Sequence, residues 1–193
     1  MNLIISVRNI NKDVSLMPAT YLRQATNEDL PTIKKIIEEA KAYLKLQGID
    51  QWQNGYPDDE TLETDVKFGI TYVLIIDDQI AATAALHQGL DVNYLNLHGG
   101  KWVNGIHGRY TAIHRIAMSS NFRGQHLSDK MITGLITISS VLGYKDVRID
   151  THPDNKGMQH VITTNGFTKR GTIYMAEKDD EETPRYAYQL IIG

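Results

Sequence analysis

The sequence predicts a mixed α/β domain in which helices flank a central sheet. A run rich in apolar and β-branched residues, Ala112 to Met118, is followed by turn residues and then by a helical apolar pattern after Gly124. Two apolar runs on either side of Asp77-Asp78-Gln79 are typical of a β-hairpin. A further strand, Lys145 to Asp150, is expected to run parallel to the first because strand, helix and strand follow one another.

The composition limits the classes of protein that are compatible with the chain. Its 193 residues suit one domain, and we assign this domain to residues 21–193 and an N-terminal extension to residues 1–20. The net charge of −3 argues against a nucleic-acid partner, and no apolar run is long enough to span a bilayer. The absence of cysteine excludes disulfides, thiolate metal sites and a cysteine nucleophile. We therefore expect a cytoplasmic protein without a nucleic-acid or membrane partner.

The remaining helices and strands are predicted from the spacing of apolar residues and from the capping and turn residues between them. Helices are expected after the capping signal Thr26–Asp29, ending at Gly48, and after Asp58. The other expected segments are strands Tyr21–Arg23, Tyr72–Ile76, Ile80–Leu86, Thr172–Glu177 and Arg185–Ile191, helix Asn155–Asn165, and an acidic loop Lys178–Pro184. Residues 87–109 are glycine-rich and irregular, so they either fold over a substrate or form an elaborated edge hairpin.

The turn between Met118 and the following helix has the features of an anion site. Arg123-Gly124-Gln125 stands where the helix begins, so several backbone N–H groups lack intrahelical partners and point outward with the positive end of the helix dipole. A P-loop would need Gly-Lys-Ser/Thr and a dinucleotide fingerprint would need G-x-G-x-x-G, and neither string occurs. The ligand is therefore expected to be a phosphate compound of another kind.

Two segments together resemble a known family. The apolar strand, the turn with its aromatic residue and Arg-Gly-Gln before a helix resemble motif A of the GNAT superfamily of acyl-CoA N-acyltransferases. The segment NKGMQHVITTNGF, Asn155 to Phe167, is similar to its motif B, and the resemblance covers the chain from about Tyr21 to the end. It implies a central, mostly antiparallel sheet with flanking helices, in which one parallel strand pair splays apart to admit the cosubstrate acetyl-CoA.

The resemblance also implies which residues bind acetyl-CoA. Backbone groups of the central strand hold the pantetheine arm and polarise the thioester, turn amides hold the pyrophosphate, and Asn155 contacts the cofactor, fixes the splayed strands or caps its helix. The implied set is Ile116, Ala117, Met118, Arg123, Gly124, Gln125, His126, Leu127, Ser128 and Asn155. His126 stands where the family usually has glycine, and Ser128 at its last small position, so we expect weakened or reshaped binding at this turn.

Acyl transfer to an amine requires a base, and His114 is the first candidate. Histidine ordinarily titrates near neutrality, and strand alternation predicts that His114 shares a face with Ile116 and Met118. The alternative is a hydrogen-bonded core histidine. Asp150 could act through a water molecule instead, or could pair with Arg115 or Arg148.

The proton donor for the departing thiolate is not evident. Many family members carry a tyrosine on the motif B helix, but the aligned position here is Ile162. Tyr174, Tyr110 or water could substitute.

Trp52 and Tyr56 are candidate walls of the acceptor pocket, although Trp52 could equally fill the edge of the core. The string Asp150-Thr151-His152-Pro153-Asp154 has the pattern of a turn, so no metal site is expected.

The sequence thus predicts an N-acetyltransferase that moves an acetyl group from acetyl-CoA to a primary amine of a small molecule or peptide by direct attack. The alternative is a weakly active or inactive CoA-binding or sensing module on the same fold, which the residues at 126 and 162 favour. A homodimer is compatible with the sequence, and no side-chain set identifies the acceptor.

Overall fold

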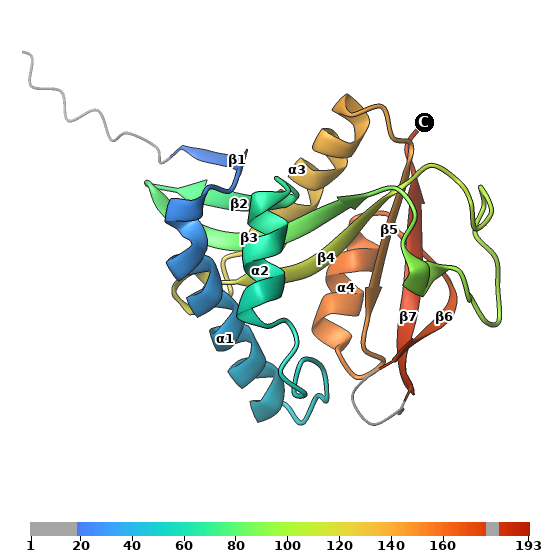
Figure 1. Ribbon diagram of the computed structural model, residues 1–193, viewed down its shortest axis with the longest axis horizontal. Helices are drawn as coiled ribbons and strands as arrows, with labels where there is room; N and C mark the ends of the chain where they lie inside the picture. Colours follow the sequence, from blue (N-terminus) through green and yellow to red (C-terminus); the bar gives the residue numbers. More distant parts are fainter. Residues whose placement is uncertain (1–18, 177–181) are drawn as a thin grey trace, which may run out of the picture.

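The computed structural model describes residues 19–176 and 182–193 and shows one seven-stranded sheet with helices on both faces (Figure 1). The strand order is β1-β2-β3-β4-β5-β7-β6, and every neighbouring pair is antiparallel except β4 and β5. The elements are β1 (Thr20–Gln24), η1 (Asn27–Asp29), α1 (Leu30–Leu46), α2 (Asp59–Lys67), β2 (Thr71–Ile76), β3 (Gln79–Gln88), η2 (Val92–Tyr94), β4 (Thr111–Met118), η3 (Ser120–Phe122), α3 (Leu127–Val141), β5 (Asp146–Thr151), α4 (Lys156–Thr164), β6 (Thr168–Ala176) and β7 (Glu182–Ile191). The predicted α/β class and mostly antiparallel sheet are confirmed.

Two of the expectations concern residues that the structure does not describe. Of the expected extension 1–20, residues 1–18 lie outside the described residues, and Thr20 already begins β1. Residues 177–181 of the expected acidic loop also lie outside them.

Helices α1 and α2 lie side by side on one face of the sheet (Figure 1). The helical spacing of α1 places Ile33, Ile36 and Ile37 against Val73 and Ile75 of β2, and all five side chains are at most 3% exposed. The sequence predicts a helix that runs to about Leu46 and is stopped by Gly48, and the observed helix ends at Leu46 with Gly48 in the left-handed region at φ 69°.

Helices α3 and α4 pack on the opposite face. Leu74 lies between Val73 and Ile75 in β2 and points away from them, into a core that includes Met131 of α3 and Ile162 of α4. Both faces of the central strands are thus covered by packed helices, and the splayed part of the sheet lies between them.

The parallel pair β4 and β5 separates part-way along its length. Its registered pairs are Thr111 with Val147, Ala112 with Arg148 and Ile113 with Ile149, whereas β4 continues to Met118. Beyond Ile113 the edge of β4 that faces β5 therefore lacks a ladder partner, as the family resemblance implies.

Strand β4 contains a bulge at the same point. On β3, Thr83 pairs with Ala117 and Ala85 with His114, so one intervening residue of β3 faces both Arg115 and Ile116. Arg115 has φ 50°, in the left-handed region. The expectation that His114 shares a face with Ile116 is wrong because the bulge interrupts the period of two: Ile113 and Ile116 both pack on the α3 and α4 core, and His114 points the other way.

Residues 89–110 pack beside β6 and β7. His98 forms a bridge with Thr172, and Tyr94, Trp102 and Tyr110 make a third apolar cluster with residues of these strands. Arg148 is fully buried between the rings of Trp102 and Tyr110, with its guanidinium carbon 4.2 and 3.7 Å from their centroids. The segment is an elaborated edge, and among its residues only Asn93 lines the cavity described next.

Candidate active site

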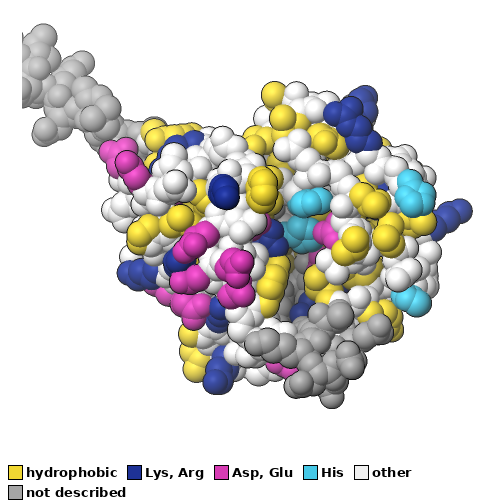
Figure 2. All heavy atoms as spheres, in the orientation of Figure 1, with side chains coloured by type: hydrophobic (Ala, Val, Ile, Leu, Met, Phe, Trp, Pro, Cys, Tyr) yellow, Lys and Arg dark blue, Asp and Glu magenta, His cyan; other side chains and the backbone are white. Residues whose placement is uncertain are grey.

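A cavity of about 880 Å³ opens where β4 and β5 separate, and Figure 2 shows the hollow near the middle of the molecule. Its walls come mainly from α1 and the connection between α1 and α2, from β4 and the turn after it, and from the end of β5 and the start of α4, with single residues of β6 and β7. The sequence-predicted residues that line it are Trp52, Tyr56, His114, Ile116, Ala117, Met118, Arg123, Asp150 and Asn155. Residues from distant parts of the chain therefore meet where β4 and β5 separate.

The turn that follows β4 is exposed, as expected of an anion site. Gly124 and His126 lie in the left-handed region at φ 82° and 55°, so His126 occupies a conformation that glycine adopts most easily. Within the described residues, the backbone amides of residues 124–126 donate no hydrogen bond. These amides and the first turn of α3 are available to a ligand, although residues 124–128 do not themselves line the cavity.

Helix α1 holds this turn in place. The backbone N–H of Ser120 donates to Glu39 at 2.8 Å, and the guanidinium of Arg123 lies 3.9 Å from the ring centroid of Tyr43. The carboxylate of Glu39 accepts this bond, which lowers its pKa against the opposing effect of burial.

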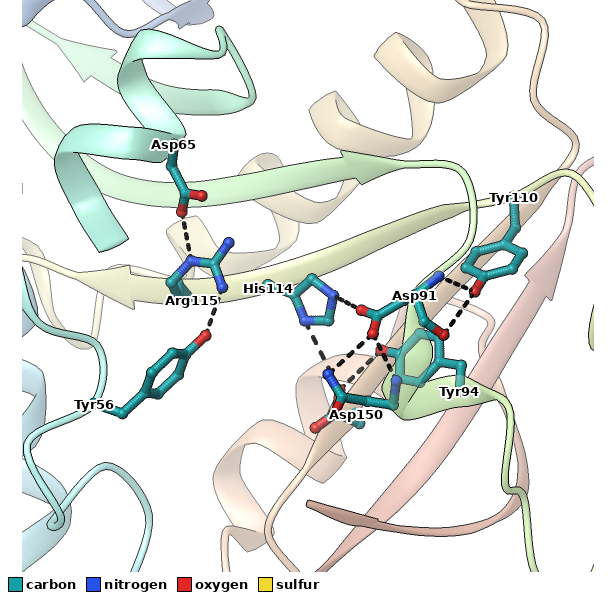
Figure 3. Close-up of polar contacts among 9 residues, drawn as sticks. Tyr56, Asp65, Asp91, Tyr94, Tyr110, His114, Arg115 and Asp150 are labelled. Carbon is teal, nitrogen blue, oxygen red and sulfur yellow. Dashed lines mark hydrogen bonds and ion pairs between the residues drawn. The ribbon is translucent and has the colours of Figure 1, made fainter. Parts of the chain in front are cut away.

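His114 lies on the cavity wall between two carboxylates (Figure 3). Its Nε2 is 2.7 Å from Oδ2 of Asp91, and its Nδ1 is 4.0 Å from Oδ1 of Asp150. The side chain is 13% exposed. His114 is therefore hydrogen-bonded, as expected of a core histidine, and also accessible from the cavity, as a base must be. The two alternatives that the sequence leaves open are compatible with each other.

Asp91 is the residue of this group that sequence reasoning missed. Its Oδ1 accepts from the backbone and side-chain nitrogens of Asn93 at 2.9 and 3.0 Å, and its own N–H donates to the hydroxyl of Tyr110 at 2.7 Å. Burial raises its pKa, but the hydrogen bond and charge of His114 outweigh this and lower the pKa to about 2. An ionised Asp91 accepts the Nε2 proton of His114, which leaves Nδ1 as the free acceptor.

Asp150 binds a tyrosine rather than an arginine. The hydroxyl of Tyr94 donates to its Oδ1 at 2.8 Å, and burial raises the pKa of Asp150 against the opposing effects of His114 and Arg185. The alternative that Asp150 pairs with Arg115 or Arg148 is wrong. The bulge turns Arg115 toward Asp65 of α2, at 2.6 Å, and Arg148 pairs with Asp146 of its own strand, at 3.1 Å.

Arg115 connects β4 to the loop between α1 and α2. Its Nε donates to Asp65, and its Nη1 donates to the hydroxyl of Tyr56 at 2.5 Å (Figure 3). Burial raises the pKa of Tyr56, and the charge of Arg115 opposes this increase. Tyr56 thus lines the cavity and also contacts the bulged strand, and its place in an acceptor pocket stays a prediction.

The tyrosines proposed from sequence as proton donors do not reach the cavity. Tyr174 is 43% exposed, packs edge-on against His98 with ring centroids 5.2 Å apart, and is not a lining residue. Tyr110 is fully buried and binds Asp91. Ile162 is also fully buried, in the core beneath α4.

Asn155 caps α4, as one of the three alternatives predicted. Its Oδ1 accepts from the N–H of Met158 at 3.0 Å, and its Nδ2 donates to Gln51 at 3.1 Å, across the cavity. His152 lies in the predicted turn, where its Nδ1 accepts from the N–H of Asp154 at 3.1 Å.

Across residues 19–176 and 182–193, no group of three or more histidine and carboxylate side chains is arranged to hold a metal ion. Helices long and apolar enough to cross a membrane are also absent from this described part of the chain.

A model of the acetyltransferase (GNAT) family matches residues 33–167, more than half of the chain. The chain belongs to the GNAT acetyltransferase family. A crystal structure of a GNAT-family acetyltransferase from Streptococcus agalactiae is 34% identical, with a TM-score of 0.78 over 90% of this chain and 96% of that one. The motif A and motif B resemblance is therefore confirmed.

More distant GNAT structures share the fold. A GNAT-family acetyltransferase from Listeria monocytogenes is 20% identical with a TM-score of 0.69, over 90% of this chain and 95% of that one. A protein from Salmonella typhimurium described as a putative acetyltransferase, solved with its cofactor acetyl-CoA, is 15% identical with a TM-score of 0.63, over 91% and 95%. A search among curated proteins finds no match to this chain.

Proposed function

We propose that the protein transfers an acetyl group from acetyl-CoA to a primary amine of a small molecule or peptide, by direct attack of the amine. Membership of the GNAT family establishes the acetyltransferase class, and the cosubstrate and acceptor class are what the proposal adds. The observation that carries it is the separation of β4 from β5 beyond Ile113, which opens onto a cavity with His114 on its wall.

The described residues fit acetyl-CoA in two respects. The edge of β4 at residues 114–118 lacks a strand partner toward β5 and can pair with the amides of a pantetheine arm. The backbone amides of residues 124–126 are exposed at the start of α3 and suit a diphosphate. When bound, acetyl-CoA supplies the activated acyl group, and the residues of the chain position it and move protons.

In the proposed reaction, His114 accepts the proton of the attacking amine. Nδ1 is the acceptor because Nε2 is committed to Asp91, and the ionised Asp91 stabilises the imidazolium that forms. Asp150 stands 4.0 Å from Nδ1, beside the place where the amine proton arrives.

The second candidate is a CoA-binding or sensing module without turnover. Two observations favour it: His126 stands where the family has glycine, in a left-handed conformation, and Ile162 stands where many members have tyrosine. In this case the cavity binds CoA, but the protein releases no thiol from acetyl-CoA in the presence of amines.

Thiol release from acetyl-CoA, measured over a panel of small amines and peptides, separates the two candidates. Saturable release that falls by at least about 100-fold in His114→Ala supports the enzyme. Binding of acetyl-CoA without release from any amine supports the sensor. The cytoplasmic location and the homodimer remain predictions.

A further inference from the structure

The proposed reaction leaves a thiolate that needs a proton, and the usual family position for the donor is occupied by the buried Ile162. All ten tyrosines of the chain lie within the described residues. Only two of them, Tyr43 and Tyr56, line the cavity. A phenol that can reach the reacting sulfur must therefore be one of these two.

Tyr43 is a poor donor because its ring packs against the turn that follows β4. The guanidinium of Arg123 lies over its ring, 3.9 Å from the centroid, beside the amides at residues 124–126. Tyr56 stands nearer to the bulge, where its hydroxyl contacts Arg115, the residue immediately before Ile116.

The hydrogen bonds of Tyr56 determine where its proton points. A phenol oxygen can accept one hydrogen bond while donating another, and here the accepting position is taken by Nη1 of Arg115 at 2.5 Å. A guanidinium cannot accept a proton in return, and the Tyr56 hydroxyl donates no hydrogen bond within the part of the chain that the structure describes. Since the residue lines the cavity, its O–H is free to donate to a ligand there.

The position of the Tyr56 hydroxyl is fixed by contacts of Arg115 on one side and by contacts of the loop that carries Tyr56 on the other. Asp65 receives Nε of Arg115 at 2.6 Å and prevents the guanidinium from rotating. On the loop side, Lys41 donates to the carbonyl of Pro57 at 2.8 Å, and the N–H of Tyr56 donates to Asn54 at 3.2 Å. The left-handed φ of 50° at Arg115, which an L-residue rarely adopts, is what directs its side chain toward Tyr56 and Asp65.

We infer that Tyr56 donates the proton to the departing CoA thiolate, and that Arg115 and Asp65 position its hydroxyl. This inference rests on the proposed function. As the C–N bond forms and the C–S bond breaks, the amine proton moves to Nδ1 of His114 and the Tyr56 proton moves to sulfur. The tyrosinate recovers a proton from water and the imidazolium returns one to water, so that the products are the amide and the free thiol.

The charges around Tyr56 suit a donor that is protonated at rest. Burial, Asp65 and Asp150 disfavour the tyrosinate, and the net effect raises the pKa of Tyr56 even though Arg115 opposes it. The same Arg115 stabilises the tyrosinate in the moment after transfer.

Tyr56→Phe removes the donor and keeps the ring. We expect kcat to fall about 10- to 100-fold, at or below the lower end of the general-acid range because a thiolate is a tolerable leaving group, with KM for acetyl-CoA little changed. A residue that only forms the acceptor wall would instead raise KM for the amine and leave kcat unchanged. Tyr21→Phe, an exposed tyrosine on β1, is the matched control and should have no effect.

A second measurement does not depend on turnover. Free CoA is bound to the wild type and to Tyr56→Phe, and the ionisation of its thiol is followed by thiolate absorbance, with a CoA analogue that lacks the sulfur as the blank. A hydrogen bond from Tyr56 stabilises the thiolate, so the bound thiol should ionise about 1 to 2 pH units lower in the wild type than in the variant.

Together the two measurements distinguish a failure of the Tyr56 role from a failure of the proposed function. Equal thiol titrations in wild type and variant overturn the inference, whether or not kcat falls, and so does an unchanged kcat. If the titration shifts but no amine is ever acetylated, the contact between Tyr56 and sulfur stands and the proposed function fails. A protein that does not bind CoA overturns both.

Discussion

Replacing Asp91 with asparagine should reverse the tautomer of His114. In the wild type, Oδ1 of Asp91 accepts two hydrogen bonds from Asn93, and Oδ2 accepts the proton of Nε2 at 2.7 Å. An asparagine that keeps its oxygen toward Asn93 must place its NH₂ where Oδ2 now stands. That group donates to Nε2, so the imidazole proton moves to Nδ1, and the nitrogen that faces Asp150 can no longer accept a proton from the amine.

The magnitude follows from what the base supplies. General base catalysis contributes about 10²- to 10⁴-fold, and a carboxylate-to-amide change behind a catalytic histidine removes up to about 10⁴-fold. We therefore expect kcat/KM for the amine to fall by about 10²- to 10⁴-fold, or about 3 to 5 kcal/mol of transition-state stabilisation. The affinity for acetyl-CoA should remain, because Asp91 does not line the cavity.

The assay is steady-state thiol release at saturating acetyl-CoA with a responsive amine, across pH. Asp78→Asn is the matched control because Asp78 is exposed in the β2–β3 turn at φ 59°, a conformation that asparagine tolerates. An Asp91→Asn protein with wild-type kcat/KM and an unchanged pH profile would show that His114 does not act as the base.

The same variant tests the ionisation of Asp91. Its folded-state pKa of about 2 lies below its ordinary value of 3.8, so its interactions stabilise the fold by about 2 kcal/mol above pH 4. This contribution is lost as the pH falls toward 2. The difference in unfolding free energy between wild type and Asp91→Asn should therefore shrink by about 2 kcal/mol over that interval, and a constant difference would contradict the assignment.

Three further predictions concern stability, measured by denaturant or thermal unfolding. Arg115→Met leaves the 7%-exposed Asp65 without its partner and should destabilise the fold by about 3 to 5 kcal/mol, part of which Asp65→Asn restores in the double variant. Ile162→Tyr should destabilise by about 1 to 3 kcal/mol, because the fully buried site has no room for a phenol; an unchanged unfolding free energy would mean that the position is open. Asn155→Ala removes the cap of α4 and should cost about 1 kcal/mol, whereas Gln51→Ala keeps the cap and should cost less than half as much; equal losses would assign the stability to the cross-cavity bond.

Local sequence patterns are sufficient to predict most of the helices and strands. The end of α1 near Gly48, the hairpin around Asp77 and Asp78, and the parallel pair follow from signals within a few residues of each element. The strand pair at the end of the chain was predicted too short at Thr172, since β6 already begins at Thr168. Gly171 is a turn-forming residue, so the sequence gives no strand signal before Thr172. In the structure Gly171 lies within β6, at a register irregularity between Lys169 and Gly171.

The site was harder to predict because its geometry depends on one extra residue in β4. Period-two alternation predicts that His114 and Ile116 share a face of the sheet. A bulge that no local sequence motif predicts puts them on opposite faces. The same bulge sends Arg115 to Asp65 rather than to Asp150. Asp91 was missed because it lies in an irregular segment, 23 residues before His114 in the chain, and only the packing of that segment brings the two together.

The bulge also explains how two neighbouring residues of β4 can serve different proton-transfer groups, since His114 is itself the proposed base and Arg115 positions the proposed acid Tyr56. His114 and Arg115 are neighbours in sequence, yet His114 contacts Asp91 from the 89–110 segment while Arg115 contacts Tyr56 and Asp65 from the α1 to α2 side (Figure 3). A regular strand would send them to opposite faces of the sheet, and only one of them could reach the cavity. The irregularity in β4 therefore lets one short stretch of strand serve both the amine and the thiolate side of the proposed reaction. Deletion of Arg115 restores the period of two and removes the residue that positions Tyr56, so kcat for thiol release should fall at least as far as in Tyr56→Phe, by about 10-fold or more.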